Sequence, residues 1–122
     1  MKCSVACNIE HIQASGEEAW ILSISSDHVA DAAMMLSGLF LGKVERIKFA
    51  DKTCSVSVHK TPAGYQLNLG GAQIAVTKIW LKAVLAMLVD SYLNGWSDTA
   101  HLDQQFDGVS VTAAILPPGE IL

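Results

Sequence analysis

The chain has 122 residues, of which 51% are hydrophobic and 16% charged, and its formal net charge is −4. This length predicts a single domain over residues 1–122, large enough to bury a core without disulfides or metals. The charged fraction is below the usual quarter, so we expect some apolar surface to be shared with another molecule. The negative charge has the wrong sign for phosphate backbones, which disfavours nucleic acid as a partner.

The N-terminus reads MKCSVACNIEHIQ, with no long apolar run after its lysine. This pattern lacks the features of a secretory signal peptide, and we expect a cytoplasmic location. Cys3, Cys7 and Cys54 form no metal-ligand spacing. If Cys3 and Cys7 lie on one strand, their Cα atoms are about 13 Å apart, too far for a disulfide. Reduced, buried thiols are therefore expected.

Residues 3–9 alternate between apolar and polar types, as a half-buried strand does. The turn signal ASGEE separates them from the run AWILSI, so these two segments are predicted to pair as a hairpin. The spacing then becomes helical over about 27–41, with Ser26 as the expected N-cap and Gly42 at the end. Its broad apolar face predicts a helix that is buried on more than one side.

Four strand-like runs follow, VERIKFA, CSVSVHK, GYQLNL and AQIAVT. Their short separators favour an antiparallel meander, and Gly70-Gly71 is the strongest hairpin signal because glycine adopts positive φ without strain. Arg46 and Lys48 should share the outer face of a strand, a pattern more typical of a solvated surface than of phosphate binding. The side chains expected to point inward are Tyr65, Leu67 and Leu69.

The stretch from Thr77 to Gly95 is strongly apolar but is not a membrane span, because Lys82 and Asp90 interrupt it. We predict a helix, and half of its circumference should pack on the sheet. That half contains Trp80, Leu81, Val84, Leu85, Met87, Leu88 and Tyr92, with Ser91 as the polar exception.

The other half of this helix carries a second apolar stripe whose large members are Ile79, Val89 and Leu93. Large aliphatic side chains gathered on one outward face need cover. Either the segment SDTAHLDQQF, the tail LPPGEIL or another chain supplies it. A homodimer contact through these three residues is one form of the last alternative.

After Trp96, the segment SDTAHLDQQFDG is predicted to form a short helix that buries Leu102 and Phe106, which are spaced i, i+4. VSVTAAIL is the expected last strand. These elements predict an α+β fold of order ββαββββααβ. Its antiparallel twisted sheet has about six to seven strands, and two main helices pack on it.

Groups suited to catalysis are sparse. His101 lies three residues after Asp98 and two before Asp103, an arrangement that suits an oriented general base or part of a metal site, and equally the solvated face of a short helix. No motif with a known mechanism accompanies it. We expect no cofactor and no metal at any of the four histidines, and His11 and His59 have no cysteine, aspartate or glutamate at metal-ligand spacing.

The acidic residues collect in three places, Glu17-Glu18, Asp27 with Asp31, and Asp98 with Asp103 and Asp107. An acidic surface beside apolar anchors suits a protein that meets a basic protein partner, since charge steers the encounter and the anchors supply affinity. The expected partner-binding residues are Asp98, His101, Asp103 and Asp107.

These patterns favour a non-catalytic protein-binding module over an enzyme. In its most specific form the hypothesis is a small acidic bacterial inhibitor of the immunity or antitoxin type that neutralises a basic effector protein. The alternative is a small-molecule-binding protein or small enzyme, with its pocket between sheet and helices and with His101, Asp98 or Trp96 at the mouth. A ligand-sized cavity with convergent polar groups would favour the alternative, and a filled core would favour the binding module.

Overall fold

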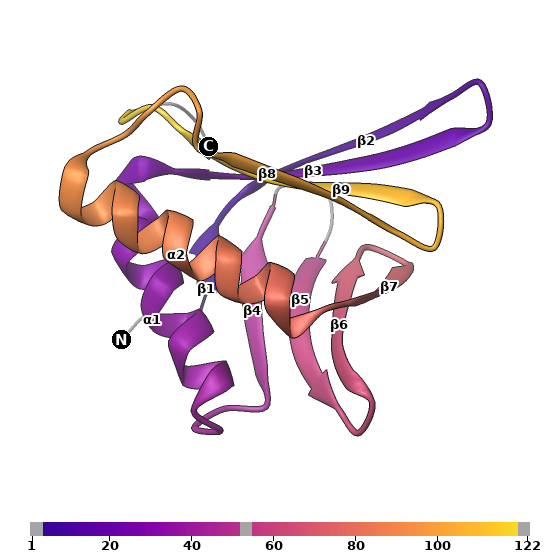
Figure 1. Cartoon of the computed structure of the whole chain (residues 1–122), viewed down its shortest axis with the longest axis horizontal. Helices are drawn as coiled ribbons and strands as arrows, with labels where there is room; N and C mark the ends of the chain where they lie inside the picture. The colour runs from indigo at the N-terminus through magenta and orange to yellow at the C-terminus, as the bar shows by residue number, and fades with distance from the viewer. Residues whose placement is uncertain (1–3, 52–54, 120–122) are drawn as a thin grey trace.

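The computed structural model describes residues 4–51 and 55–119, and it has the α+β architecture predicted from the sequence (Figure 1). Cys3 and Cys54, which were expected to be buried thiols, lie outside the described residues. The elements in chain order are β1 (Ser4–Ala6), β2 (Asn8–Ala14), β3 (Glu17–Ser25), the short 3-10 helix η1 (Ser26–His28), α1 (Val29–Phe40), β4 (Arg46–Ala50), β5 (Ser55–Thr61), β6 (Gly64–Leu69), β7 (Ala72–Val76), α2 (Lys78–Asn94), β8 (His101–Phe106) and β9 (Val109–Leu116).

The strands form two sheets rather than the single antiparallel sheet predicted from the sequence. A five-stranded sheet, which we call the meander sheet, has the order β1-β4-β5-β6-β7, and a four-stranded sheet, the hairpin sheet, has the order β2-β3-β9-β8. Both are mixed, because β1 pairs in parallel with β4 and β3 pairs in parallel with β9. The single-sheet prediction was therefore wrong, although the class and the approximate element order were right.

The chain passes from one sheet to the other at Cys7. The sequence run that alternates over residues 3–9 indicated one strand, but β1 ends at Ala6 and β2 begins at Asn8. The Cys7 amide donates a hydrogen bond of 2.9 Å to the carbonyl of Ala50, the residue that pairs with Ala6. Alternation survives the crossing because both sheets bury the same side of this extended segment, where Val5 and Cys7 are buried.

The meander sheet follows the sequence prediction closely over β4 to β7. Each of these strands pairs antiparallel with the next. Tyr65, Leu67 and Leu69 are all buried, and Gly70 has the positive φ of 60° that a tight hairpin needs. The first sequence segments also pair as predicted, since β2 and β3 form an antiparallel hairpin.

The segment predicted as a short third helix is instead the strand β8. Leu102 and Phe106 do share a face, but an i, i+4 spacing places residues on one side of a strand as well as of a helix. The turn at Asp107 and Gly108 decides between them, since both residues have positive φ, 51° and 82°. This is the geometry of a type I′ hairpin turn, for which Asp-Gly is a preferred sequence.

The core lies between the two sheets and the helices, which pack against each other (Figure 1). Trp80 of α2 meets Phe106 of β8 edge to face, with ring centroids 5.5 Å apart. Trp80, Leu81, Leu88 and Ser91 are the buried residues of α2, as the helical wheel predicted. Tyr92 was also expected to face inward, but its side chain is 64% exposed, so that prediction was wrong. The apolar face of α1 buries Val29, Ala32, Met35, Leu36 and Leu39.

The apolar stretch in α2 is interrupted as the sequence indicated. Across the described residues, no helix has both the length and the apolar character required to cross a membrane.

Candidate protein-binding surfaces

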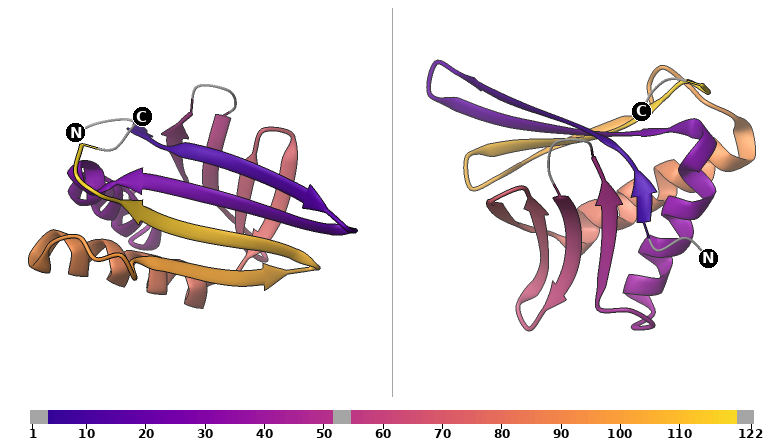
Figure 2. Two further views of the ribbon diagram at one scale, coloured as in Figure 1. Left: turned by 90° about the horizontal axis from the view of Figure 1, so that it is seen from above. Right: turned by 180° about the vertical axis from the view of Figure 1, so that it is seen from behind.

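The hairpin sheet has one face in the core and one face that no helix covers. Strand alternation places Leu22, Val111 and Ile115 on the inner face, where all three are buried. The opposite face looks outward, and Figure 2 (left) views the four strands from this open side, with both helices behind them. The same alternation assigns residues such as Glu10, Ile12, Ala19, Thr112 and Asp103 to this outer face.

The charges of the hairpin sheet all have one sign. Its strands and their two turns contain Glu10, Glu17, Glu18, Asp103 and Asp107, but no lysine or arginine. The strands of the meander sheet carry Arg46, Lys48 and Lys60 instead. The net charge of −4 is thus distributed unevenly, and the hairpin sheet is the acidic part of the molecule.

The middle of the outer face carries mostly small side chains. Apart from Ile21, small side chains from β3 and β9 occupy its central positions, namely Ala19, Ser23, Ser110, Thr112 and Ala114. Ile12, on the edge strand β2, is 45% exposed. The Thr112 hydroxyl donates a 2.8 Å hydrogen bond to the Asp103 carboxylate across the β8–β9 pair, which holds that carboxylate in place. An acidic rim around a centre of small apolar and hydroxyl side chains is the kind of surface that can dock on another protein.

A depression lies on this face near the turns of the two hairpins. It encloses about 430 Å³ that is open to solvent, and its lining includes Ile12, Glu17, Ala19, Gln105 and Ser110. An aliphatic wall beside a carboxylate matches the side chain of a lysine or arginine, whose methylene stem is apolar and whose head is cationic. Glu10 and Ile12 were not among the partner-binding residues predicted from the sequence, although alternation along β2 places both on the same face of that strand.

The four residues predicted to bind a partner do not gather at one point. Asp98 lies in the loop before β8, His101 and Asp103 lie on the outer face of β8, and Asp107 lies in the β8–β9 turn. They are spread along the full length of this edge strand and are all exposed. Together with the outer face of β2 and β3, they extend the acidic surface rather than form a compact site.

Within residues 4–51 and 55–119, His101 forms no side-chain hydrogen bond or ion pair with Asp98 or Asp103. Asp98 and His101 were expected to share a short helix, but the strand conformation of β8 removes that relation. Among residues 4–51 and 55–119, no group of three or more histidine, cysteine or acidic side chains could hold a metal ion. A different histidine, His11, is held in place by its neighbours. Its Nε2 atom lies 2.7 Å from the Glu18 carboxylate, and its ring stacks on Trp20 with ring centroids 3.8 Å apart.

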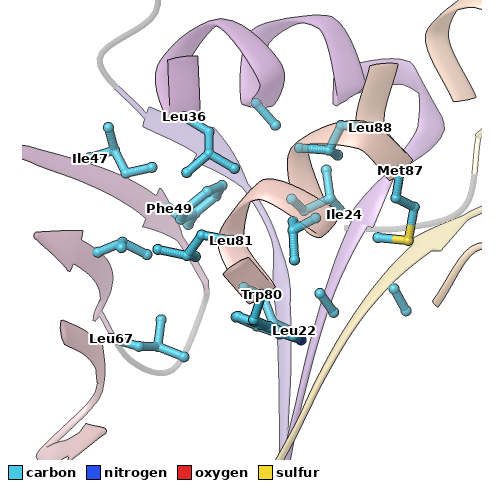
Figure 3. Close-up of a pocket in the computed structure, with 15 residues that line it drawn as sticks. Leu22, Ile24, Leu36, Ile47, Phe49, Leu67, Trp80, Leu81, Met87 and Leu88 are labelled. Carbon is cyan, nitrogen blue, oxygen red and sulfur yellow. The ribbon is translucent and has the colours of Figure 1, made fainter. Parts of the chain in front are cut away.

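The interior offers little room for a ligand. A cavity of about 40 Å³ lies between the sheets and the helices, and apolar side chains line it, including Leu22, Phe49, Leu81 and Leu88 (Figure 3). A water molecule needs roughly 10–15 Å³ measured in this way, so the space would fit a few waters at most. His101, Asp98 and Trp96 are not among its lining residues.

The outward side of α2 is a second uncovered surface. Ile79 is 83% exposed, Leu93 is 69% exposed and Val89 is 40% exposed, whereas Leu88 on the inward side is 2% exposed. The segment after Trp96 does not cover this side, because it pairs with β9 and the Trp96 indole donates a 2.8 Å hydrogen bond to the Ile115 carbonyl. The tail residues 120–122 lie outside the described residues.

A shallow groove runs along this side of α2. It has an open volume of about 550 Å³ and passes between Phe40, at the end of α1, and the outward residues of α2. The apolar lining from α2 consists of Leu85, Ala86, Val89 and Leu93, and the polar lining consists of Lys82, Asp90 and Asn94. In Figure 1, α2 lies at the front of the molecule.

The outer face of the meander sheet is polar. Arg46 and Lys48 are exposed there, as predicted, and pair across the sheet with His59 and Ser57. The Asn68 amide lies 3.3 Å from the Ser57 hydroxyl and 3.1 Å from His59 Nδ1. Both contacts use the Asn68 Nδ2 group, whereas its Oδ1 atom is buried without a hydrogen-bond partner among the described residues.

Comparisons with protein-family models, with curated proteins and with solved structures gave no match to this chain.

Proposed function

We propose that this chain is a non-catalytic protein-binding module whose hairpin sheet receives a basic protein partner. The observation that carries the proposal is the segregation of charge, with only acidic residues on a sheet whose outer face is open. A surface of one sign accelerates encounter with a partner of the opposite sign and disfavours partners of its own sign.

The binding surface combines the small side chains at the centre of the outer face with its acidic rim. The depression beside Ile12 and Glu17 receives a lysine or arginine side chain, and Asp103 and the exposed residues around β8 meet further cations. In the most specific form of the proposal, the chain is a small acidic inhibitor of the bacterial immunity or antitoxin type, and the partner is a basic effector enzyme that it neutralises.

A small-molecule site or enzyme active site near His101 receives less support. The internal cavity has a volume of about 40 Å³ and an apolar lining. The core is therefore nearly filled, which favours a binding module over a ligand pocket. His101 lies on the opposite, outer face of the hairpin sheet, so it does not reach that cavity.

Two variants that change the net charge by the same amount, one inside the proposed binding surface and one outside it, test the proposal. Glu17→Lys adds a cation to the depression, whereas Glu45→Lys makes the same change on an exposed residue just before β4. Tagged wild-type protein and both variants are used to capture proteins from the native host, and the recovered partner is purified and titrated by calorimetry.

The expected result is one basic partner whose affinity falls about tenfold or more with Glu17→Lys and stays within about twofold with Glu45→Lys. Raising the salt concentration should weaken wild-type binding, because the rim charges are exposed. Failure to recover any stable partner, or equal affinity for both variants, would contradict the proposal.

A further inference from the structure

The outward side of α2 has the pattern of a helix-pairing seam. Ile79, Lys82, Ala86, Val89 and Leu93 follow one another at alternating intervals of three and four residues, the spacing of core positions in a coiled coil. All five are exposed, and all but Ile79 also line the groove beside Phe40. Four of the five positions are apolar, and the small Ala86 at the centre allows another helix to approach closely.

We infer that a second copy of this chain docks on this seam, with the two α2 helices antiparallel and the two-fold axis passing beside Ala86. The inference uses a different surface from the proposed partner site, so either can hold without the other. The symmetry pairs each residue with the one equally far on the other side of Ala86.

This register matches apolar residues with apolar residues. Ile79 lies seven residues before Ala86 and Leu93 lies seven after it, so each Ile79 meets the Leu93 of the second copy. Val89 and Ala83, three residues from the centre on either side, face each other in the same way. The two most exposed aliphatic side chains of the helix are thereby buried against each other.

The same register matches the charges. Lys82 lies four residues before Ala86 and Asp90 lies four after it, so the dimer contains two Lys82–Asp90 pairs. Within the described part of the chain Lys82 has no ion pair of its own, and Asp90 accepts one hydrogen bond of 2.7 Å from Asn94. A parallel arrangement would instead place Lys82 beside Lys82 and Asp90 beside Asp90, so the charges select the antiparallel one.

The size of the contact between the two α2 helices indicates how tightly the dimer should form. A helix of 17 residues is about 25 Å long, and a contact confined to one helix face and the adjoining groove is small for a stable complex. Stable interfaces bury roughly 1,200–2,000 Å² in total. The dimer should therefore form in the micromolar range of protein concentration.

Exchanging the charges of Lys82 and Asp90 tests whether a second copy of the chain binds α2 and whether the two helices pair about Ala86. Lys82→Glu alone places two carboxylates together at both pairs of the dimer, and Asp90→Lys alone places two ammonium groups together at both pairs. The double variant Lys82→Glu with Asp90→Lys restores both attractive pairs with their signs exchanged. Lys78→Glu is the matched control, because it has the same charge change on the same helix but faces the uncharged Asn94.

Sedimentation velocity over a range of protein concentrations at low ionic strength gives the dissociation constant of each variant. Wild type should show a monomer–dimer equilibrium, each single variant should weaken it about tenfold or more, and the double variant and the control should stay within about threefold of wild type. A wild-type chain that remains monomeric at high concentration overturns the inference. So does a double variant as weak as the single ones, because a different occupant or register gains nothing from the exchange.

Discussion

The outer face of the hairpin sheet and the outward side of α2 are both uncovered, but they differ in how their charges are arranged. The sheet carries Glu10, Glu17 and Asp103 with no cation, so a second copy of the same face would be repelled. The helix carries Lys82 and Asp90 at equal distances from Ala86, so a second copy fits. A surface of one sign needs a different partner, whereas a surface with both signs placed about a centre can pair with itself.

The largest expected effect is on the free energy of unfolding, and it should differ between the inward and outward sides of α2. Leu88 is buried in the core, so Leu88→Ala should lower the free energy of unfolding by about 2–5 kcal/mol through lost burial and a new cavity. Leu93→Ala should change it by no more than about 0.5 kcal/mol in the monomer, because that side chain is exposed. Urea unfolding at a protein concentration below the dimer range measures both. A large loss with Leu93→Ala would mean that this side of α2 belongs to the fold itself.

The fold was predictable where the pattern was local. Alternation identified the meander from β4 to β7, and helical spacing identified α1 and α2 with Trp80 and Leu88 inward. The parallel pairs β1–β4 and β3–β9 were not predictable, because they join segments that are far apart in the chain. The first passage between the two sheets occurs at a single residue, Cys7, where no sequence signal interrupts the alternation.

The surfaces were predictable to a smaller degree. The wheel correctly left Ile79, Val89 and Leu93 outside the core, but it placed Tyr92 inward because that residue lies near the boundary between the two sides. Asp98, Asp103 and Asp107 are close in sequence, yet β8 spreads them along a strand. The acidic face required the hairpin pairing, which brings Glu10 and Glu17 to the same sheet as Asp103.

Substitutions on α2 should affect dimerisation without affecting partner binding by the hairpin sheet. Val89→Asp places a carboxylate in the apolar part of the seam and should weaken dimerisation on the order of a hundredfold. Met34→Asp, at an exposed apolar residue of α1, is the control and should leave dimerisation within about twofold of wild type. Sedimentation velocity measures both.

The same variants should leave binding of the basic partner unchanged, and Glu17→Lys should leave the dimer unchanged. If Val89→Asp removed partner binding as well, the two surfaces would act as one site, and the comparison between them would fail.

The most direct test of the self-complementary helix is to mix the two single variants. Lys82→Glu and Asp90→Lys should each be monomeric at a concentration where wild type is half dimeric. In a mixed dimer the two introduced side chains, a glutamate and a lysine, face each other, and the unchanged Asp90 of one chain faces the unchanged Lys82 of the other. Both pairs are then attractive, so native mass spectrometry of the mixture should show the mixed dimer in preference to either homodimer. A mixture that contains only monomers would contradict the antiparallel pairing about Ala86.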